Sequence, residues 1–247
     1  MKNKFVCLMP MAGKGVRFKN FRYNTPKPLI MIKNKPMFLQ SAKTFSKIKE
    51  WVFVTSKNIF ENKIFKKTLK HFKKKKVIVI KRYTKGQAIS VLKGLKFIEK
   101  NKNIIIHSCD LNFNCNFFRI EKEINKYDII VFTTKSNKFH KKNHTQFSWV
   151  AKSNKSKNIE ISLKKNFSGK LKKTSRVLVG SFVFKNKKIL EKLINHIVKS
   201  NLKIKKEYYI DTAVAIADKL GFKVSEEIIN KYLSWGTHKE VLIYNKI

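Results

Sequence analysis

The sequence predicts an α/β fold built on a doubly wound, mixed but mostly parallel sheet with helices on both of its faces. The first observation is that short apolar runs alternate with helical patterns along residues 1–134. Strands that alternate with helices favour parallel pairing, because each helix carries the chain back across the sheet. The second is that the runs are continuously apolar, which is typical of strands covered on both faces. The third is the length, since 247 residues can bury the core of one large domain or of two small ones.

The first half of the chain follows this alternation closely. Five apolar or β-branched runs predict strands, at residues 5–9, 51–54, 77–80, 104–106 and 129–132. Helical patterns predict a helix after each of the first three strands, at residues 36–48, 58–71 and 86–100. In the last of these helices, one apolar stripe consists of Ala88, Val91, Leu92, Leu95 and Ile98.

The pattern changes after residue 134. Residues 135–144 predict a polar, basic loop, in which we expect His140 and His144 to be solvated, because no carboxylate or cysteine lies nearby to complete a metal site. Three runs then predict antiparallel strands of a small lid, at residues 149–150, 159–161 and 177–184. Two helices, a strand and a short last helix follow, at residues 187–199, 208–220, 222–224 and from about residue 236. No repeat or flexible linker divides the chain, so we predict a single domain over residues 1–247.

The charge of the chain is extreme but is made almost entirely of lysine. The chain has 57 Lys and Arg against 15 Asp and Glu, a formal net charge of +42, and only five of the 57 are Arg. Proteins that read bases or grip phosphates specifically rely on the planar fork of Arg. We therefore interpret most of the charge as a lysine-rich, solvated surface that reflects composition, and the rest as attraction for anions. A basic nucleic-acid-binding protein stays an alternative, but the clusters of Arg and aromatic residues that it predicts are missing from the sequence.

The sequence gives no indication of export or of a membrane span. No apolar run approaches the roughly 18 residues that a membrane helix needs, and the start of the chain has no small-residue cleavage site. Cys7, Cys109 and Cys115 are an odd number and lie in or near apolar runs, as expected for buried thiols in a reducing compartment. We therefore expect a cytoplasmic protein with no membrane partner.

Segments of unusual composition fall where the predicted strands end, which is where a doubly wound sheet binds ligands. In residues 10–18, Gly13 and Gly15 lie two positions apart, with Lys14 between them and Arg17 after them. Glycines at this spacing let backbone N–H groups turn towards an anion. The segment has neither the third glycine of a dinucleotide fingerprint nor the Gly-Lys-Ser/Thr of a P-loop. A plain strand-to-helix turn therefore stays the alternative to phosphate binding.

Two further segments add a constrained lysine and a carboxylate. Lys27 lies between Pro26 and Pro28, which stiffen the backbone and hold it extended. Asp110 follows a buried strand, where a carboxylate is costly unless a cation pairs with it. A solvent-exposed lysine in a proline turn and an aspartate that caps a strand are the alternatives.

The motifs in this part of the chain resemble the start of the sugar-1-phosphate nucleotidyltransferases, which are NTP transferases. Ala-Gly-Lys-Gly-Val-Arg-Phe at residues 12–18, Thr-Pro-Lys-Pro-Leu-Ile at 25–30 and Lys-Pro-Met at 35–37 are most similar to the capsule and surface-polysaccharide branch. The resemblance extends over nearly the whole chain and is strongest in residues 9–37. It implies a Rossmann-like fold and an enzyme that joins an NTP to a sugar 1-phosphate, giving a nucleotide sugar and pyrophosphate.

The resemblance also implies how the nucleotide is bound, within residues 1–134. Arg17 and Lys27 would neutralise charge as pyrophosphate leaves, and Asp110 would bind Mg²⁺. The triphosphate would be wrapped by a loop made of Met11, Ala12, Gly13, Lys14 and Gly15.

The base and the acceptor would be bound by later segments. Residues 84–88 resemble the family's base segment, so Gly86 and Gln87 would read the base, with a glycine-initiated helix as the alternative. The acceptor would be bound within residues 135–247, where segments similar to the family's contain Gly180, Glu207, Tyr208, Gly236 and Thr237.

Two departures from the family pattern affect the metal and the acceptor phosphate. Where many relatives carry a second metal-binding aspartate, this sequence has Ser234, so Asp211 is our candidate for that role. The family's Glu-Lys pair near the acceptor phosphate is reduced to Leu163-Lys164, which leaves Lys164 as the candidate phosphate partner. An inactive relative kept as a subunit is therefore an alternative, although the retained residues of the first half argue against it.

The implied mechanism is an in-line attack of an acceptor phosphate oxygen on the α-phosphorus of the NTP. Because a phosphate monoester is largely a dianion at neutral pH, the enzyme needs to supply cations and orientation rather than a general base. A cytidylyltransferase that acts on a phosphocholine-like, phosphonate or other phosphorylated non-sugar compound is the alternative within the same chemistry. The expected partners are an NTP and a phosphorylated small molecule, with no specific nucleic acid, and assembly into a homo-oligomer is left open.

Overall fold

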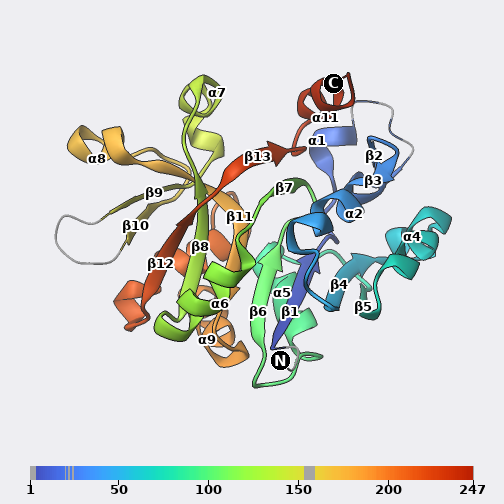
Figure 1. The fold of residues 1–247 in the computed structure, drawn as a ribbon, viewed down its shortest axis with the longest axis horizontal. Coiled ribbons are helices and arrows are strands. Elements are labelled where there is room, and N and C mark those ends of the chain that lie inside the picture. Colours follow the sequence, from blue (N-terminus) through green and yellow to red (C-terminus); the bar gives the residue numbers. More distant parts are fainter. Residues whose placement is uncertain (1–3, 20, 22, 24, 153–158, 247) are drawn as a thin grey trace.

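A mixed, mostly parallel sheet forms the centre of the computed structural model, which describes residues 4–19, 21, 23, 25–152 and 159–246 (Figure 1). Within those residues it has nine strands: β1 (Phe5–Pro10), β4 (Glu50–Ser56), β5 (Lys74–Ile80), β6 (Asn103–His107), β8 (Ile129–Thr134), β9 (Trp149–Lys152), β10 (Ile159–Ser162), β11 (Arg176–Phe184) and β12 (Val224–Ile228). From one edge the order is β5-β4-β1-β6-β11, and β11 then pairs with both β8 and β9. Beyond these, β12 pairs with β8 and β10 pairs with β9.

The strand order reverses beside β1. This strand pairs in parallel with β4 on one side and β6 on the other, and β4 pairs in parallel with β5. The chain therefore builds outwards through β4 and β5 before it returns to place β6 next to β1, and the carboxyl ends of β1 and β6 form a switch point where such sheets bind ligands. In the second half, β11 runs antiparallel to β6, β8 and β9, whereas β12 is parallel to β8. This confirms the doubly wound, Rossmann-like sheet and its antiparallel addition.

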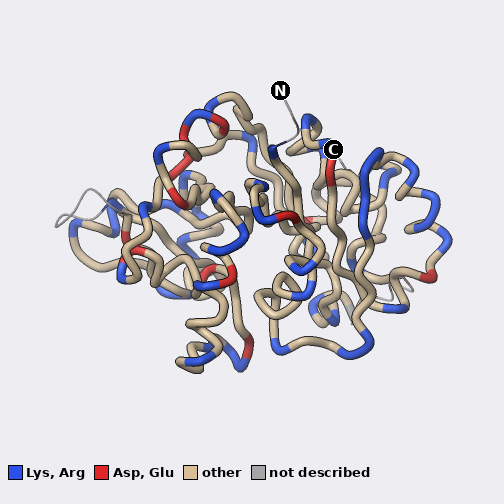
Figure 2. Tube along the Cα trace, turned by 90° about the horizontal axis from the view of Figure 1, so that it is seen from below, with Lys and Arg blue, Asp and Glu red and all other residues tan. Residues whose placement is uncertain are grey.

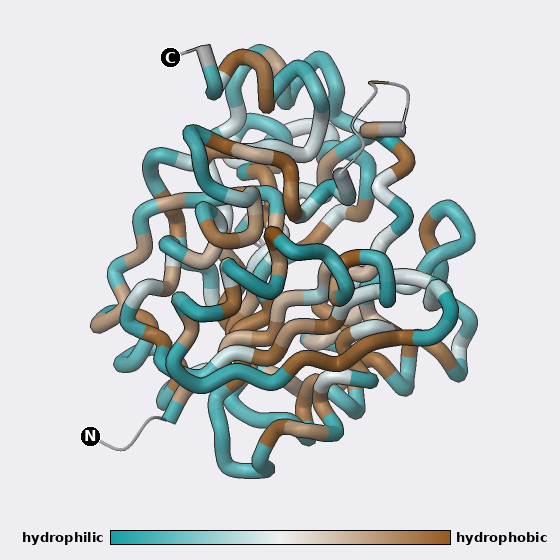
Figure 3. The backbone as a smooth tube through the Cα atoms, turned by 90° about the vertical axis from the view of Figure 1, so that its right-hand side faces the viewer, coloured by the Kyte–Doolittle hydropathy of each residue, from teal (hydrophilic) through white to brown (hydrophobic). Residues whose placement is uncertain are grey.

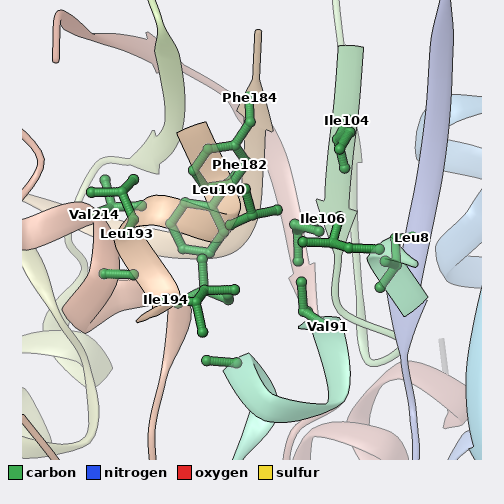
Figure 4. Packing of buried hydrophobic residues seen from close by; sticks show 14 of the residues in the cluster. Leu8, Val91, Ile104, Ile106, Phe182, Phe184, Leu190, Leu193, Ile194 and Val214 are labelled. Atoms are coloured by element: carbon green, nitrogen blue, oxygen red, sulfur yellow. The ribbon is translucent and has the colours of Figure 1, made fainter. Parts of the chain in front are cut away.

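Two hydrophobic layers cover the faces of the sheet. In β1, Val6 and Leu8 belong to one layer, and Cys7 and Met9 to the other, as the alternation of a strand requires. Figure 4 shows the first layer, in which Leu8 faces Val91 of a helix. The helices of this layer are α5 (Gln87–Leu95), α9 (Lys187–Lys199) and α10 (Ile210–Ala215). The second layer contains α2 (Met37–Ala42), α4 (Lys63–Thr68) and α6 (Phe117–Lys126). Figure 3 shows the hydrophobic strands within a more hydrophilic periphery.

A third, smaller cluster brings the two ends of the chain together. It is formed by Phe18, Ile30, Ile32, Met37, Trp235 and Val241. Four of them come from α1 (Val16–Lys19), β2 (Met31–Ile32), which pairs with β3 (Lys35–Pro36), α2 and α11 (His238–Lys246). The other two lie just outside these elements, Ile30 directly before β2 and Trp235 shortly before α11. A second small sheet pairs β7 (Leu111–Asn114) with β13 (Asn230–Ser234), which leads into α11. Figure 1 accordingly shows α1 next to α11.

Each predicted strand has a counterpart, but the one expected at residues 222–224 begins only at Val224, as β12. Several helices are shorter or interrupted. Residues 36–48 form α2 followed by a 3₁₀ turn, η2 (Lys43–Phe45). Residues 58–71 divide at Asn62, whose side chain accepts from the N–H of Ile64 and caps α4 after α3 (Lys57–Glu61). The last turn of that segment is η3 (Leu69–His71), and residues 208–220 form α10 and η5 (Asp218–Leu220). The sequence prediction omitted the short elements α1, β2 and β3 as well as β7, α6, α8 (Gly169–Thr174) and β13.

Residues 135–144 are not the polar loop that the sequence predicts. They contain α7 (Lys138–Lys142), which begins with a capping box: Asn137 accepts from the backbone N–H of His140, and the His140 ring accepts from that of Asn137. His140 is therefore buried, with its ring edge-on to Phe147, and burial lowers its pKa. The expectation of a solvated His140 is wrong, whereas His144, in η4 (His144–Gln146), is exposed as expected.

The Lys and Arg positions are not confined to one segment of the backbone trace (Figure 2). Figure 2 shows Lys and Arg positions along the whole trace of the described residues. This distribution agrees with a charge that reflects composition. None of the helices in the described part of the chain combines the length and the apolar character needed to span a bilayer.

Candidate active site

The glycine-rich loop leaves β1 at the switch point and is anchored to the neighbouring strand. The N–H of Met11 donates to the carbonyl of Val54 at 2.8 Å. The side chains of Met11 and Ala12 are buried, one in each hydrophobic layer, so these residues offer mainly their backbone to a ligand. Gly13 and Lys14 follow as exposed residues.

The two glycines of the loop have different local surroundings. Among the residues that the structure describes, none has a heavy atom within 4 Å of a Cβ placed on Gly13. Gly15 has a φ of 61°, in the left-handed region that favours glycine, and a Cβ there would lie 3.4 Å from the Cβ of Lys27. Gly15 therefore lets the loop turn where the proline-flanked segment passes beside it.

Lys27 and Asp110 form an ion pair in the site. Lys27 begins η1 (Lys27–Leu29), and its ammonium donates to the Asp110 carboxylate that follows β6. The two side chains are only 14% and 20% exposed. Burial alone would raise the pKa of Asp110, but the charge and hydrogen bond of Lys27 and the charge of Arg17 outweigh it and lower this pKa. Asp110 is thus held as a carboxylate close to two cations.

Arg17 and Gly236 bring the N- and C-terminal segments together beside Asp110. A Cβ on Gly236 would lie 3.5 Å from Nη1 of Arg17. The preceding residue, Trp235, donates its backbone N–H to the Asp110 carbonyl at 2.7 Å. Thr237 donates both its N–H and its hydroxyl to a carboxylate in the first turn of α11, at 2.8 Å each, and so helps to cap that helix.

The predicted base segment is joined to the chain that precedes α10. Gly86 has a φ of 116°, and a Cβ there would lie 2.5 Å from the backbone N and O of Tyr208. The backbone of Tyr208 donates to the Lys85 carbonyl at 2.9 Å and accepts from the N–H of Ala88 at 3.0 Å. Close packing therefore requires a glycine at position 86, while Gln87, the first residue of α5, is half-buried.

The two tyrosines before α10 lie in different environments. Tyr208 is buried in the core, and an asparagine side chain accepts from its hydroxyl. Tyr209 is half-buried, and its hydroxyl donates to the exposed Glu207 at 2.7 Å. Burial and Glu207 raise the pKa of Tyr209, and the Arg17 charge opposes them, so Tyr209 lies within electrostatic reach of Arg17. Tyr208 thus contacts the base segment through its backbone, whereas the Tyr209 hydroxyl is bonded to Glu207.

Gly180 lies where β11 shifts its register, beside the segment that carries Asp110. A Cβ on Gly180 would lie 2.9 Å from Oγ of Ser108, and the Gly180 carbonyl accepts from the N–H of Ser108 at 3.2 Å. Gly180 therefore permits the close approach of β11 to this segment.

Lys164 and Asp211 form a second and looser ion pair. Their charged atoms are 4.0 Å apart, and the side chains are 29% and 17% exposed. Lys164 also donates to the carbonyl of Gln146 at 3.0 Å, and Asp211 accepts from the hydroxyl of Ser148 at 2.7 Å. Asp211 is thus bound to the segment before β9, whereas Asp110 is bound to Lys27.

The chain provides few ligands for a metal ion of its own. Over the residues that the structure describes, no group of three or more His, Cys, Asp or Glu could hold one. Mg²⁺, however, is often held by one or two carboxylates together with water and substrate phosphates. Asp110 is ionised and partly exposed at the switch point, so it fits that mode of binding.

Three residues of the site were missed by the sequence reasoning: Tyr83, Ser148 and Tyr209. Tyr83 is 57% exposed, directly before the base segment, and Nζ of Lys14 lies 5.4 Å from its ring centroid. The sequence signal was an aromatic residue directly before that segment, but its exposure could not be seen there. Ser148 carried none, because its contact with Asp211 joins residues 63 positions apart.

The arrangement suits the binding of phosphates and the stabilisation of charge moving between them. Backbone N–H groups of a glycine loop, Arg17 and Lys27 can face anionic oxygens, and Asp110 can share a divalent cation with them. Comparison with known proteins supports this interpretation. The model of the family "Nucleotidyl transferase" matches residues 8–218. No curated protein matches the chain in sequence.

Solved structures of similar fold cover nearly the whole chain. A nucleoside-diphosphate-sugar pyrophosphorylase from Vibrio cholerae RC9 has a TM-score of 0.79 at 16% identity, over 98% of this chain and 100% of that one. A protein from Bacillus anthracis assigned as a glucose-1-phosphate thymidylyltransferase has a TM-score of 0.74 at 17% identity, over 98% and 94%. An inositol-1-phosphate CTP transferase from T. maritima has a TM-score of 0.70 at 14% identity, over 97% and 93%. These TM-scores establish the shared fold. The family model, whose matched residues include the glycine loop and Asp110, establishes the class: the chain belongs to the nucleotidyl transferase family and is a nucleotidyltransferase.

Proposed function

We propose that the protein joins an NTP to a sugar 1-phosphate, giving a nucleotide sugar and pyrophosphate. The observation that carries the proposal is the largely buried ion pair of Lys27 and Asp110, which lies beside Arg17 at the end of the glycine loop. A role in capsule or surface-polysaccharide synthesis in the cytoplasm is part of the proposal. It is supported by the resemblance of residues 12–18 to that branch of the family.

The loop of residues 11–15 would hold the triphosphate through backbone N–H groups. The acceptor phosphate would lie near Gly180 and Lys164, and one of its oxygens would attack the α-phosphorus in line. The new P–O bond forms as the bond to the oxygen bridging the α- and β-phosphates breaks, and this oxygen leaves with pyrophosphate. Arg17 and Lys27 would stabilise the charge that develops on the leaving group. The dianionic acceptor needs no general base.

Asp110 would hold Mg²⁺, with Asp211 as the candidate second ligand on the acceptor side. The metal would offset phosphate charge and orient the triphosphate. Lys27 would keep Asp110 ionised before the substrates bind and would face phosphate oxygens once they are bound. The nucleotide would be bound by residues 1–134 and the acceptor by residues 135–247.

A cytidylyltransferase for a phosphorylated non-sugar acceptor is the second candidate. Asp211 favours it, because this residue lies two positions after the aromatic pair Tyr208 and Tyr209 and resembles the aspartate that relatives acting on phosphocholine carry just after an aromatic pair. One of the similar structures is an inositol-1-phosphate CTP transferase. Both candidates use the same attack, so the identity of the acceptor distinguishes them.

A screen for pyrophosphate release tests the proposal. CTP, UTP, dTTP, GTP and ATP are each combined with Mg²⁺ and a panel of sugar 1-phosphates, phosphocholine and phosphonates. The proposal expects release that requires both an NTP and a sugar 1-phosphate. Release with phosphocholine or a phosphonate alone would select the second candidate. No release across the panel would favour an inactive relative.

A further inference from the structure

A buried chain of hydrogen bonds leads from the core to the segment that carries Asp110. His107, the last residue of β6, is fully buried. Its Nδ1 lies 2.6 Å from the hydroxyl of Ser181 in β11, and its Nε2 lies 2.9 Å from the hydroxyl of Ser41 in α2. The Ser41 hydroxyl lies 2.6 Å from the carbonyl oxygen of Ser108, two residues before Asp110.

The direction of each hydrogen bond, from donor to acceptor, follows from counting the available protons. The carbonyl of Ser108 has no proton to give, so Ser41 must donate its single hydroxyl proton to it. The oxygen of Ser41 then accepts from His107, which places the ring proton on Nε2. Burial lowers the pKa of His107 to about 4, so the ring is neutral at pH 7. Its Nδ1 is therefore an acceptor, and the hydroxyl of Ser181 donates to it.

The same segment is held from two sides. The N–H of Ser108 donates to the Gly180 carbonyl at 3.2 Å, while its carbonyl accepts from Ser41. The His107 ring packs edge-on against the aromatic rings of Phe45 and Phe113, with centroids 4.9 and 6.0 Å away. An apolar side chain could fill that space without any hydrogen-bond partner, whereas a buried imidazole is costly unless both nitrogens are satisfied. The polar ring therefore adds directional contacts that packing alone does not require.

We propose that Ser41 and His107 are positioning residues for Asp110. His107 orients the Ser41 hydroxyl, Ser41 fixes the Ser108 carbonyl, and the fixed backbone aims the Asp110 carboxylate at Lys27. The inference rests on the role proposed for Asp110 in nucleotidyl transfer. Groups that hold a metal-binding carboxylate in place typically contribute about 10- to 100-fold to activity or metal affinity.

Ser41→Ala tests the link to Ser108. The variant removes the hydroxyl from both Ser108 and Nε2 of His107, but Nε2 keeps an acceptor, the backbone carbonyl of residue 41 at 3.0 Å, so no ring nitrogen is left unsatisfied. Thr68→Val in α4 is the matched control, because it removes a similarly buried hydroxyl that donates to the Ile64 carbonyl at 2.7 Å. Two further variants test the ring. The side chain of His107→Gln is long enough for its amide N–H to donate towards Ser41, whereas that of His107→Asn is one methylene too short.

The readouts are kcat and KM for the NTP, hydrogen exchange of the peptide that covers residues 108–111, and the free energy of unfolding in urea. We expect Ser41→Ala to lower kcat about tenfold with KM within about twofold, and to speed exchange in that peptide. Thr68→Val should change neither kcat nor that exchange. His107→Asn should resemble Ser41→Ala, and His107→Gln should retain most of kcat.

Two results would overturn the proposal. One is a Ser41→Ala protein with parental kcat and parental exchange in residues 108–111. The other is a loss of kcat that follows the loss of unfolding free energy equally in Ser41→Ala and Thr68→Val. If the His107 variants do not fold, the comparison of Ser41→Ala with Thr68→Val alone tests whether Ser41 positions Asp110. If the parental protein releases no pyrophosphate, the proposed function fails, but the exchange data still decide whether Ser41 holds this segment.

Discussion

Ion pairs of nearly equal burial occur inside and outside the site. The side chains of Lys27 and Asp110 are 14% and 20% exposed, and those of Lys102 and Glu50 are 14% and 19% exposed. The second pair joins the N-terminal ends of β4 and β6, at the opposite edge of the sheet from the site. It therefore serves as a control for the loss of a buried charge.

Replacing Lys27 or Asp110 by Ala should lower turnover by roughly 10²-fold with the fold intact, because each substitution removes a preorganised charged group from the reacting phosphates. Lys102→Ala should lower the free energy of unfolding but leave turnover at the parental level. Steady-state kinetics and urea unfolding of the three variants test this. A folded Lys27→Ala protein with parental turnover would remove that residue from the mechanism.

Gly13→Ala should separate ligand binding from stability. A methyl group there meets no atom of the described residues within 4 Å, so the free energy of unfolding should stay parental. It would occupy the space proposed for phosphates and raise KM for the NTP roughly tenfold. Gly15→Ala should lower the free energy of unfolding by about 1 kcal/mol, because its φ of 61° is strained for alanine. An unchanged KM in Gly13→Ala would exclude phosphates from that space.

His107 should make stability depend on pH in mildly acidic solution. Its folded-state pKa of about 4 lies below the ordinary value of 6.5, so between these values the unfolded chain binds more protons. Its contribution is complete above pH 6.5 and is lost as the pH falls towards 4, by about 3 kcal/mol in all. Urea unfolding at pH 4.5 and pH 7 should show a smaller difference for His107→Gln than for the parental chain. Equal differences would contradict this account.

Individual site residues could be predicted from the sequence, but their contacts could not. Flanking prolines singled out Lys27, and the end of an apolar run singled out Asp110. Their ion pair joins residues 83 positions apart, which no local pattern specifies. The same limit applies to Tyr208 and Tyr209, because local sequence does not determine which of the two rings is buried in the core.

At the scale of elements, the strands were predictable because their runs are apolar on both faces. Helix limits were not, because side-chain caps set them, as Asn62 does for α4 and Asn137 with His140 does for α7. The signal for α6 was present in the sequence, since Asn116 precedes an apolar face that includes Ile120 and Ile124. Within the described residues, β7 and β13 pair with each other and with no other strand, although they lie far apart in sequence. Neither contains a continuous apolar run like those that predicted the other strands.

Gly86→Ala should disturb two elements at once. Its Cβ would lie 2.5 Å from the backbone of Tyr208, so the base segment and the chain before α10 would have to separate, at about 2 kcal/mol or more. Gly221→Ala is the control, because its φ of 81° is also unfavourable for alanine but its Cβ would meet no atom within 4 Å. Urea unfolding should show the larger loss for Gly86→Ala. Equal losses would mean that backbone strain alone requires the glycine.

For the molecule as a whole, the net charge of +42 does not identify the function. The cations spread over the described trace (Figure 2), whereas Arg17 and Lys27 lie at the switch point of the sheet. Contacts between distant segments meet there: Arg17 with Gly236, Lys27 with Asp110, and the base segment with the chain before α10. The strands of the sheet could be predicted from local sequence patterns. That these distant segments meet at one place follows only from the order of the strands in the sheet.

The central claim is that the site transfers a nucleotidyl group to a phosphate. Phosphorus-31 NMR of the protein with Mg²⁺, an NTP and the acceptor chosen by the screen tests it directly. We expect the resonances of a new phosphoanhydride, in which the acceptor phosphate is joined to the nucleoside monophosphate, together with an equal amount of pyrophosphate. Release of inorganic phosphate without a phosphoanhydride product, or no reaction with any pair of substrates, would contradict it.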